Sequence, residues 1–161
     1  RAIERFESFL KETLQYIKKN SNKKPIIKLH ATEYFDIKPI IKKVDPSIPV
    51  YQHEDILKLL KSCDVLISLN YSTILLDALI LNKPSLVFLP EKQNFEQEEI
   101  IKQKAVLSVS NNSELKNQME KILFNEDVRN DLIKNGKLFI EKYFSFQGNS
   151  CEILKNKLLD K

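Results

Sequence analysis

The sequence contains few of the residues that mark several common protein classes. Its two cysteines, Cys63 and Cys151, lie far apart and form no CxxC pair, which excludes a disulfide framework and a zinc site of that kind. We expect both to be small buried residues in a reducing cytoplasm. Two glycines and six prolines among 161 residues exclude a collagen-like or linker-like chain.

Several motifs with well-defined chemistry are also missing. The sequence has no Walker phosphate loop, Gly-x-Ser-x-Gly elbow, HExxH motif or pair of metal-binding carboxylates, so it supports neither a hydrolase nor a kinase, and no metal site is expected. The longest nearly uncharged apolar run, residues 65–81, is interrupted by Ser68, Asn70, Asp77 and other polar residues. It predicts a buried strand and helix instead of a membrane span of about 20 apolar residues.

The composition is that of one globular domain. Apolar residues make up 42% of the chain and charged residues 30%, and a chain of this length can bury about 70% of the surface that it exposes when unfolded. The net charge of +4 is small and well mixed, so no nucleic-acid partner is expected. The chain begins at Arg1 inside an amphipathic pattern, without Met. We therefore expect residues 1–161 to be a single domain cut from a longer chain.

Hydrophobic periodicity predicts strands that alternate with helices. Apolar runs predict strands at 26–29, 50–51, 64–69, 84–89 and 106–109. Helical spacing predicts helices at 2–19, 35–44, 54–62, 74–81, 96–104, 114–124, 126–143 and 149–159. We expect Asn82 to end one helix in a left-handed conformation, and Asn112-Ser113 and Asn125 to cap two later helices. The alternation predicts a Rossmann-like α/β domain, a parallel sheet flanked by helices, with extra C-terminal helices.

Two polar loops follow predicted strands, where open parallel sheets bind their ligands. Residues 30–33 follow one strand, and residues 70–73 follow another. In the second loop, Ser72 and Thr73 open a buried helix whose first N–H groups favour a phosphate. Asp77 lies about 6 Å further along the same helix face, from where its carboxylate can accept hydrogen bonds from ribose hydroxyls. The spacing leaves a second interpretation open, in which Ser72 and Thr73 only cap the helix and Asp77 pairs with a lysine.

Three segments resemble a known group of enzymes. Residues 72–84, STILLDALILNKP, resemble the S-[ST]-x-x-x-E-A-x-x-x-G-K-P segment of GT-B glycosyltransferases and their relatives. These relatives include CDP-glycerol glycerophosphotransferases, UDP-N-acetylglucosamine 2-epimerase-like proteins and bacterial capsule transferases. Residues 56–68 are similar to a stretch upstream of that segment, and residues 27–30 resemble a K-x-H-P segment, so the likeness covers 24–145. The sequence departs from the pattern at Asp77 (Glu in the family), Ala31 (Pro) and Asn82 (Gly).

The resemblance implies one half of a GT-B architecture, in which two Rossmann-like halves face each other across a cleft, and it places residues 1–161 as the C-terminal part of a longer two-domain chain. The C-terminal half would bind a nucleotide-activated donor. Ser72 and Thr73 would hold the donor's phosphates, with Asn70 beside them, and Asp77 would replace the family's Glu on the ribose. The helix terminus and hydroxyls would do the work of a cation, so no metal is implied.

The resemblance also implies groups around the departing nucleotide and a set of partners. His30 would be catalytic, assisting the nucleotide's departure by charge or hydrogen bonding, and Gln52 and His53 would lie against the base. The donor would be UDP-, CDP- or CMP-linked, with no further cofactor. The N-terminal half of the same chain would hold the acceptor, which is expected to be lipid-linked at the membrane surface.

We therefore expect a transferase in the synthesis of cell-surface polysaccharide or glycolipid, located in the cytoplasm and peripheral to the inner face of the membrane. This half alone is expected to be inactive. Two alternatives remain open. A UDP-sugar 2-epimerase-like domain needs acidic residues near the sugar, for which Glu33 and Asp36 are the candidates. A non-catalytic Rossmann-like interaction module would have lost ligand binding, which the shorter Asp77 and the scarcity of glycine favour.

Overall fold

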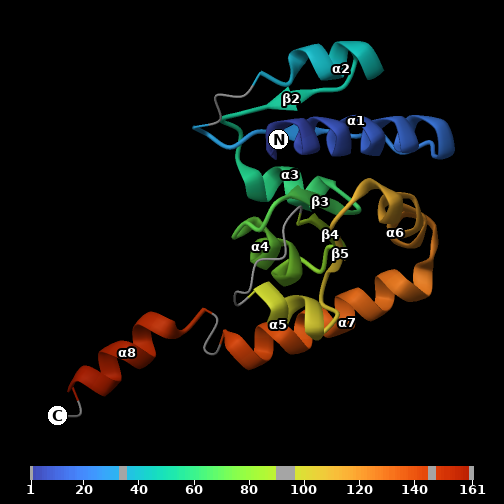
Figure 1. Ribbon diagram of the computed structural model, residues 1–161. Helices are drawn as coiled ribbons and strands as arrows, with labels where there is room; N and C mark the ends of the chain where they lie inside the picture. Colours follow the sequence, from blue (N-terminus) through green and yellow to red (C-terminus); the bar gives the residue numbers. More distant parts are fainter. Residues whose placement is uncertain (1, 33–35, 90–96, 145–147, 160–161) are drawn as a thin grey trace.

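The computed structural model describes residues 2–32, 36–89, 97–144 and 148–159, in which strands and helices alternate (Figure 1). The strands are β1 (Ile27–Lys28), β2 (Val50–Tyr51), β3 (Leu66–Leu69), β4 (Ser85–Phe88) and β5 (Leu107–Val109). The helices are α1 (Ala2–Asn20), α2 (Lys38–Val44), α3 (Ile56–Ser62), α4 (Ile74–Ile80), α5 (Gln97–Lys102), α6 (Asn112–Phe124), α7 (Glu126–Tyr143) and α8 (Ser150–Leu159).

The strands form two parallel sheets. In the larger one, β3, β4 and β5 lie side by side in that order, with Leu66 opposite Ser85 and Leu86 opposite Leu107. In the smaller one, β1 pairs with β2. The predicted α/β class, with parallel strands flanked by helices, is confirmed. The strands that we expected in one sheet are, however, divided between two.

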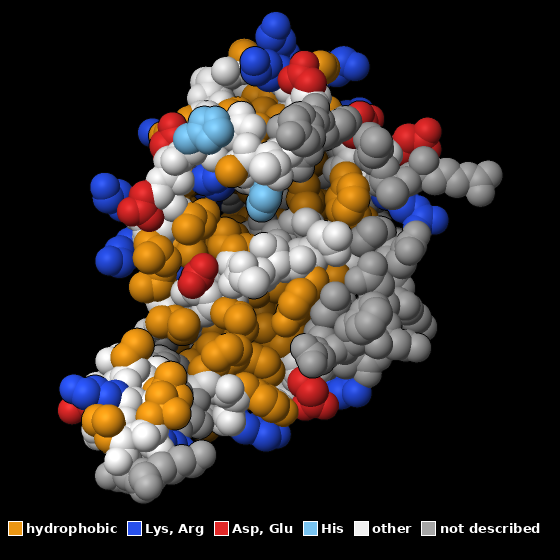
Figure 2. Space-filling model, turned by 90° about the vertical axis from the view of Figure 1, so that its left-hand side faces the viewer, with side chains coloured by type: hydrophobic (Ala, Val, Ile, Leu, Met, Phe, Trp, Pro, Cys, Tyr) orange, Lys and Arg blue, Asp and Glu red, His pale blue; other side chains and the backbone are white. Residues whose placement is uncertain are grey.

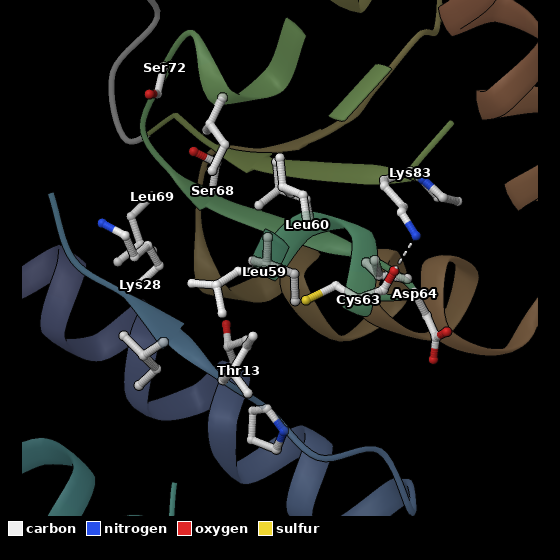
Figure 3. A pocket seen from close by; sticks show the side chains of 18 of the residues that line it. Thr13, Lys28, Leu59, Leu60, Cys63, Asp64, Ser68, Leu69, Ser72 and Lys83 are labelled. Atoms are coloured by element: carbon white, nitrogen blue, oxygen red, sulfur yellow. Dashed lines mark hydrogen bonds between the residues drawn. The ribbon is translucent and has the colours of Figure 1, made fainter. Parts of the chain in front are cut away.

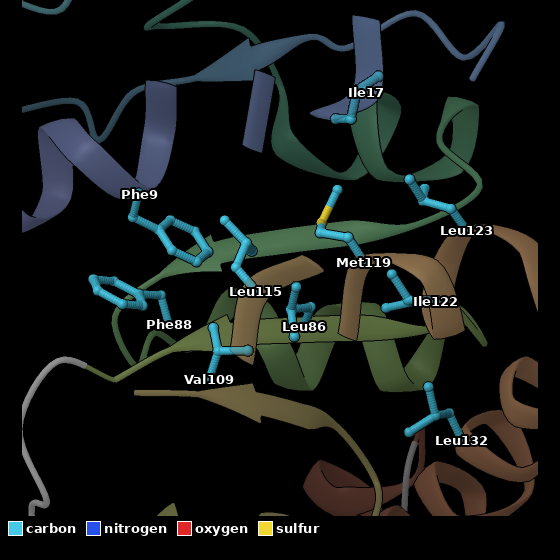
Figure 4. Close-up of a cluster of buried hydrophobic side chains, with 10 residues drawn as sticks. All are labelled: Phe9, Ile17, Leu86, Phe88, Val109, Leu115, Met119, Ile122, Leu123 and Leu132. Atoms are coloured by element: carbon cyan, nitrogen blue, oxygen red, sulfur yellow. The ribbon is translucent and has the colours of Figure 1, made fainter. Parts of the chain in front are cut away.

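One face of the larger sheet packs against α1 and α6 (Figure 4). Leu86 and Phe88 of β4 meet Phe9 of α1 and Met119 of α6 in one buried cluster. The rings of Phe9 and Phe88 stack with their centroids 4.1 Å apart. Burying a phenylalanine stabilises a fold by roughly 1.5–3 kcal/mol, so this contact fastens α1 to the sheet.

The opposite face packs against α4, α5 and α7. Val87 of β4, Leu79 of α4 and Phe139 of α7 belong to this second buried cluster. Because β4 is buried along its whole length, its residues are apolar on both faces apart from Ser85. Gly136 of α7 allows that helix to approach α4 closely, since a Cβ on it would lie 2.9 Å from Cδ2 of Leu79.

Helix α1 covers both sheets at once. Leu14 of α1 belongs to a third cluster with Ile41 of α2, against which Ile27 of β1 packs. Phe9 and Ile17, on the same helix, belong to the cluster on the larger sheet. The two sheets therefore share one covering helix on the same side.

Helix ends follow their capping side chains. Asn125 caps α7 as predicted, because its Oδ1 accepts from the N–H of Val128, and α7 has the predicted bounds. The predicted cap of the preceding helix at Asn112-Ser113 is wrong by one residue. Asn111 Oδ1 accepts from the N–H of Glu114, whereas Asn112 Nδ2 donates to side chains of α1.

Other helix ends differ modestly from the prediction. Asn82 has the expected left-handed conformation, with φ 55°, just after α4. The helix predicted from Phe35 begins at Lys38, and Phe35 itself lies outside the described residues. The start of the helix predicted over 96–104 also lies outside them, and its described part ends at Lys102.

Helix α8 extends away from the body of the domain (Figure 1). None of its described side chains is buried, and Leu154, Leu158 and Leu159 are all more than half exposed. Cys151 on this helix is exposed, so the expectation that both cysteines are buried is wrong for it, while Cys63 is half-buried. No helix in the described part of the chain is long and apolar enough to cross a bilayer.

Candidate functional site

A cleft of about 1370 Å³ separates the two sheets, and we call it the β1–β3 cleft (Figure 3). Ile27 and Leu29 line one side, Ile67 and Leu69 line the other, and side chains of α1 and α3 close it above and below. Figure 3 shows Lys28, Leu69 and Ser72 toward one end, where β1 and β3 have their carboxyl ends. Lys83 lies at the other end, where its Nζ donates to the carbonyl oxygen of Cys63 over 2.7 Å.

The carboxyl end of this cleft brings the two predicted loops together. His30 from the loop after β1, and Asn70, Ser72 and Thr73 from the loop after β3, all line it, as does Asp77 of α4. The loops are far apart in sequence, but parallel strands place their carboxyl ends at one edge. Figure 2 shows this side of the molecule, on which histidine and hydrophobic side chains are both exposed.

Ser72 and Thr73 do not act as caps. Thr73 is the N-cap residue of α4 but has a right-handed helical conformation, with φ −57° and ψ −21°, and its side chain makes no cap hydrogen bond. The N–H groups of the first turn bond instead to backbone carbonyls, that of Leu75 to Ser72 and that of Leu76 to Thr73. Both hydroxyls are exposed and without a partner among the described residues. The interpretation that they only cap the helix is therefore wrong.

Asp77 is half-buried on α4. Within the described residues no lysine or arginine lies within ion-pair distance of it, and the two described ion pairs involve Asp45 and Asp64. The interpretation in which Asp77 pairs with a lysine is therefore not supported by the geometry. Its carboxylate is left as an acceptor on the wall of the cleft.

The loop that carries these hydroxyls begins with a left-handed residue. Asn70 has φ 83°, a conformation that Asn tolerates better than most residues. Its Oδ1 accepts from the N–H of Tyr71, and its carbonyl accepts from the hydroxyl of Ser68, which is only 7% exposed. These bonds turn the chain out of β3 and fix the start of the loop. The sequence did not predict this conformation.

His30 is exposed, and its hydrogen bonds assign its tautomer. Nδ1 accepts from the backbone N–H of Thr32 and lies 2.8 Å from the Thr32 hydroxyl. An N–H can only donate, so Nδ1 carries no proton in this arrangement and the neutral ring has its proton on Nε2. Nε2–H is left as a hydrogen-bond donor at the carboxyl end of the cleft.

Lys28 is a candidate that the sequence analysis did not single out. It is half-buried, lines the cleft, and its Nζ donates to the carbonyl oxygens of Leu29 (2.6 Å) and Gln52 (2.8 Å). No carboxylate lies within ion-pair distance of it in the described residues. An ammonium has three donors, so one remains for a ligand. The sequence signal was its place as the lysine of the K-x-H-P resemblance, two residues before His30.

Gln52 and His53 do not line the cleft. Gln52 Nε2 donates to the carbonyl oxygen of Ala31, so this side chain holds the loop that carries His30. The N–H groups of Gln52 and His53 both donate to Oε2 of Glu54. Three backbone hydrogen bonds lower the pKa of the Glu54 carboxyl below its ordinary value. The largest effect comes from the N–H of Glu54 itself, and smaller effects come from those of Gln52 and His53. The predicted contact of Gln52 and His53 with a base stays a prediction.

The described residues contain no cluster of three or more His, Cys, Asp or Glu side chains that could hold a metal ion. The donors at the carboxyl end of the cleft are instead hydroxyls, one ammonium and one imidazole N–H. Hydroxyl, lysine and imidazole donors together suit phosphate oxygens, and the Asp77 carboxylate suits a group with hydroxyls to donate.

An α/β domain with hydrogen-bond donors gathered at the carboxyl ends of parallel strands is typical of nucleotide-dependent enzymes. Comparison with known families defines the class further: residues 4–156 match the model of the CDP-glycerol:poly(glycerophosphate) glycerophosphotransferases. The chain belongs to this family, which is a family of transferases. No curated protein matches the chain.

Proposed function

We propose that this domain binds the donor of a glycerophosphotransferase reaction, a nucleotide-activated glycerol phosphate such as CDP-glycerol. The observation that carries the proposal is the convergence of His30, Ser72, Thr73 and Asp77 on one end of the β1–β3 cleft in a chain of this family. The reaction would serve the synthesis of a cell-surface polymer, with this domain as the C-terminal half of a GT-B architecture.

The donor's two phosphates would lie against the hydrogen-bond donors at the carboxyl end of the cleft. The hydroxyls of Ser72 and Thr73, which have no partner in the described residues, would each donate to a phosphate oxygen. Lys28 would supply the positive charge, because its ammonium has one donor left. The carboxylate of Asp77 would accept from the hydroxyls of the ribose.

The proposed chemistry is a displacement at phosphorus. A hydroxyl of the acceptor attacks the phosphorus of the glycerol phosphate, a new P–O bond forms, and the bond from that phosphorus to the oxygen of CMP breaks. The acceptor's proton goes to a base that we expect on the N-terminal half. Negative charge develops on CMP, where a hydrogen bond from His30 Nε2–H and the charge of Lys28 would stabilise it.

The 2-epimerase alternative has less support from the geometry. Of its two acidic candidates, Asp36 accepts from the N–H of Lys38 at the start of α2 and does not line the cleft. Glu33 lies outside the described residues. The non-catalytic module differs from the proposal in one measurable property, since it would bind no nucleotide.

A thermal-shift titration of the chain tests the proposal, with CDP-glycerol, CDP, CMP, UDP and UDP-N-acetylglucosamine as probes. A ligand at about 100 times its Kd adds roughly 2.7 kcal/mol to the free energy of unfolding, which raises Tm by several degrees. We expect this shift with CDP-glycerol and CDP. Ser72→Ala removes one hydrogen bond to a charged group and should weaken binding by about 10–150-fold. The matched control for Asp77→Ala is Asp36→Ala, which removes a carboxylate outside the cleft.

The outcomes separate the candidates. A shift with CDP compounds that Asp77→Ala loses and Asp36→Ala keeps supports the proposal. A shift with UDP-N-acetylglucosamine alone favours the epimerase. No shift with any nucleotide at millimolar concentration contradicts donor binding and favours the interaction module.

A further inference from the structure

The strands on the two sides of the β1–β3 cleft have unpaired edges that face each other. The N–H groups of Ile27 and Leu29 donate toward β2, to the carbonyl oxygens of Pro49 and Tyr51. Backbone groups alternate in direction along a strand, so the N–H and C=O of Lys28 point away from β2 and into the cleft. In β3, the N–H groups of Leu66 and Asn70 donate to the β4 side. The backbone groups of Ile67 and Leu69 therefore point into the cleft. No backbone hydrogen bond joins β1 to β3 in the described residues.

The side chains of the two strands already alternate in the same phase. Ile27 and Leu29 belong to the cluster under α1 on the smaller sheet, and Val65 and Ile67 belong to the cluster under α1 on the larger one. A shift of pairing by one residue would send every side chain to the wrong face. Here the two strands run in parallel under one helix with matching faces, so they can pair by sideways movement alone.

A buried polar group also marks the gap. Thr13 lies in the middle of α1 between residues that cover the two sheets, is 5% exposed, and lines the cleft (Figure 3). Its hydroxyl is buried and has no hydrogen-bond partner. A buried hydroxyl without a partner is unfavourable, and the unpaired strand edges below it add further polar groups without a partner in the protein. Pairing of β1 with β3 would satisfy the backbone groups on the two strand edges below Thr13.

We propose that β1 and β3 pair when the donor binds, which closes the cleft into one parallel sheet of strand order β2-β1-β3-β4-β5. This inference rests on the proposed function. Paired strands lie about 4.8 Å apart, so closure would bring Lys28 of β1 and the His30 loop next to the loop after β3. Only in the closed state can one phosphate accept hydrogen bonds from the groups of both loops. The donor therefore shifts the equilibrium toward pairing by its difference in affinity between the two states.

Hydrogen exchange measured by NMR on the isotopically labelled 161-residue chain tests this directly, because alternate residues of β3 act as reporter and control. The amides of Ile67 and Leu69 point into the cleft, whereas those of Leu66 and Asn70 donate to the β4 side over 3.0 and 2.9 Å. With saturating CDP-glycerol, we expect exchange at Ile67 and Leu69 to slow by at least about tenfold. Exchange at Leu66 and Asn70 should change little.

Leu69→Pro is the decisive variant. It removes the one N–H of that residue, which points into the cleft, and an edge strand tolerates proline in such a position. Leu69→Ala is the matched control, because it shortens the side chain but keeps the N–H. We expect the Pro variant to lose the donor-induced slowing at Ile67 and to bind CDP-glycerol at least about tenfold more weakly than the Ala variant.

Each result has a distinct meaning. If CDP-glycerol perturbs the resonances of Ser72 and Thr73 without slowing exchange at Ile67 and Leu69, closure is wrong and the proposed donor site stands. If it neither perturbs these resonances nor slows exchange, both proposals fail. If exchange at Ile67 and Leu69 is already as slow as at Leu66 without ligand, the coupling of closure to the donor is wrong.

Discussion

Replacing Gly136 by alanine tests the close contact between α7 and α4. Two effects of opposite sign compete at this position. Alanine stabilises a helix interior by about 1 kcal/mol relative to glycine. Its Cβ, however, would lie 2.9 Å from Cδ2 of Leu79, whereas carbon atoms pack best at about 3.5–4.0 Å. The Leu79 methyl must therefore move by roughly 0.5–1 Å.

That movement is resisted, because Leu79 is 3% exposed and belongs to a cluster with Val87 and Phe139. Overpacking of this kind costs about 1–3 kcal/mol. We expect Gly136→Ala to lower the free energy of unfolding by about 0–2 kcal/mol, the difference between the two effects. Lys137→Ala, at the next and exposed position of the same helix, is the control and should change stability by less than about 0.5 kcal/mol.

The effect of Gly136→Ala on the free energy of unfolding should change sign when Leu79 is replaced by alanine. Leu79→Ala removes Cδ2 and costs about 2–5 kcal/mol by itself. In that background the nearest remaining atom of residue 79 is its Cβ, at an ordinary contact distance of 3.8 Å, so the gain in helix propensity of about 1 kcal/mol remains. Urea unfolding of the four proteins, followed by circular dichroism, gives this double-mutant cycle. If Gly136→Ala stabilises the original protein as much as the Leu79→Ala protein, the steric reasoning is refuted.

Two further substitutions test capping and surface charge. Asn111→Ala removes the side chain that accepts from the N–H of Glu114, so it should lower the free energy of unfolding by about 1 kcal/mol, while Asn117→Ala on the exposed face of α6 should not. Lys23 Nζ donates to the carboxylate of Asp64 over 2.6 Å. This hydrogen bond has the largest effect in lowering the pKa of Asp64, and the positive charge of the lysine lowers it further. The resulting stabilisation is complete above the ordinary pKa of 3.8 and is lost as the pH falls through the lowered value. The original protein should therefore have a higher free energy of unfolding than Asp64→Asn at neutral pH, and this difference should vanish in acid. A difference that persists at pH 2 would contradict the assignment of the stabilisation to the Lys23–Asp64 hydrogen bond.

Local signals in the sequence predicted the elements well. All five described strands and eight described helices lie at predicted positions. The bounds of α7 agree with the prediction because Asn125 is both the end of one helix and the cap of the next. The cap of α6 was placed one residue late, since Asn111 and Asn112 are adjacent and chemically identical. Only the tertiary bonds from Asn112 to Ser8 and Glu12 distinguish them.

Non-local features were harder to predict. Strand pairing depends on contacts across the chain, and no local pattern could say that β1 and β2 form a sheet separate from β3, β4 and β5. The convergence of the His30 and Ser72 loops followed from the general rule for parallel strands. Lys28 matched the lysine of the K-x-H-P segment but was given no role, because its two carbonyl partners and its place on the cleft come from the fold.

The position of α1 has a consequence for how this chain is made. Its main partner, α6, comes much later in the sequence, and the hydrogen bond from Asn112 to Ser8 joins residues 104 positions apart. A ribosome that adds about 5–20 residues per second needs roughly 5–20 s to synthesise that interval. Until then, the buried cluster that contains Phe9 and Ile17 of α1 lacks its α6 side chains, among them Leu115 and Met119. During synthesis, the apolar face of α1 is therefore exposed to chaperones and to aggregation until α6 emerges.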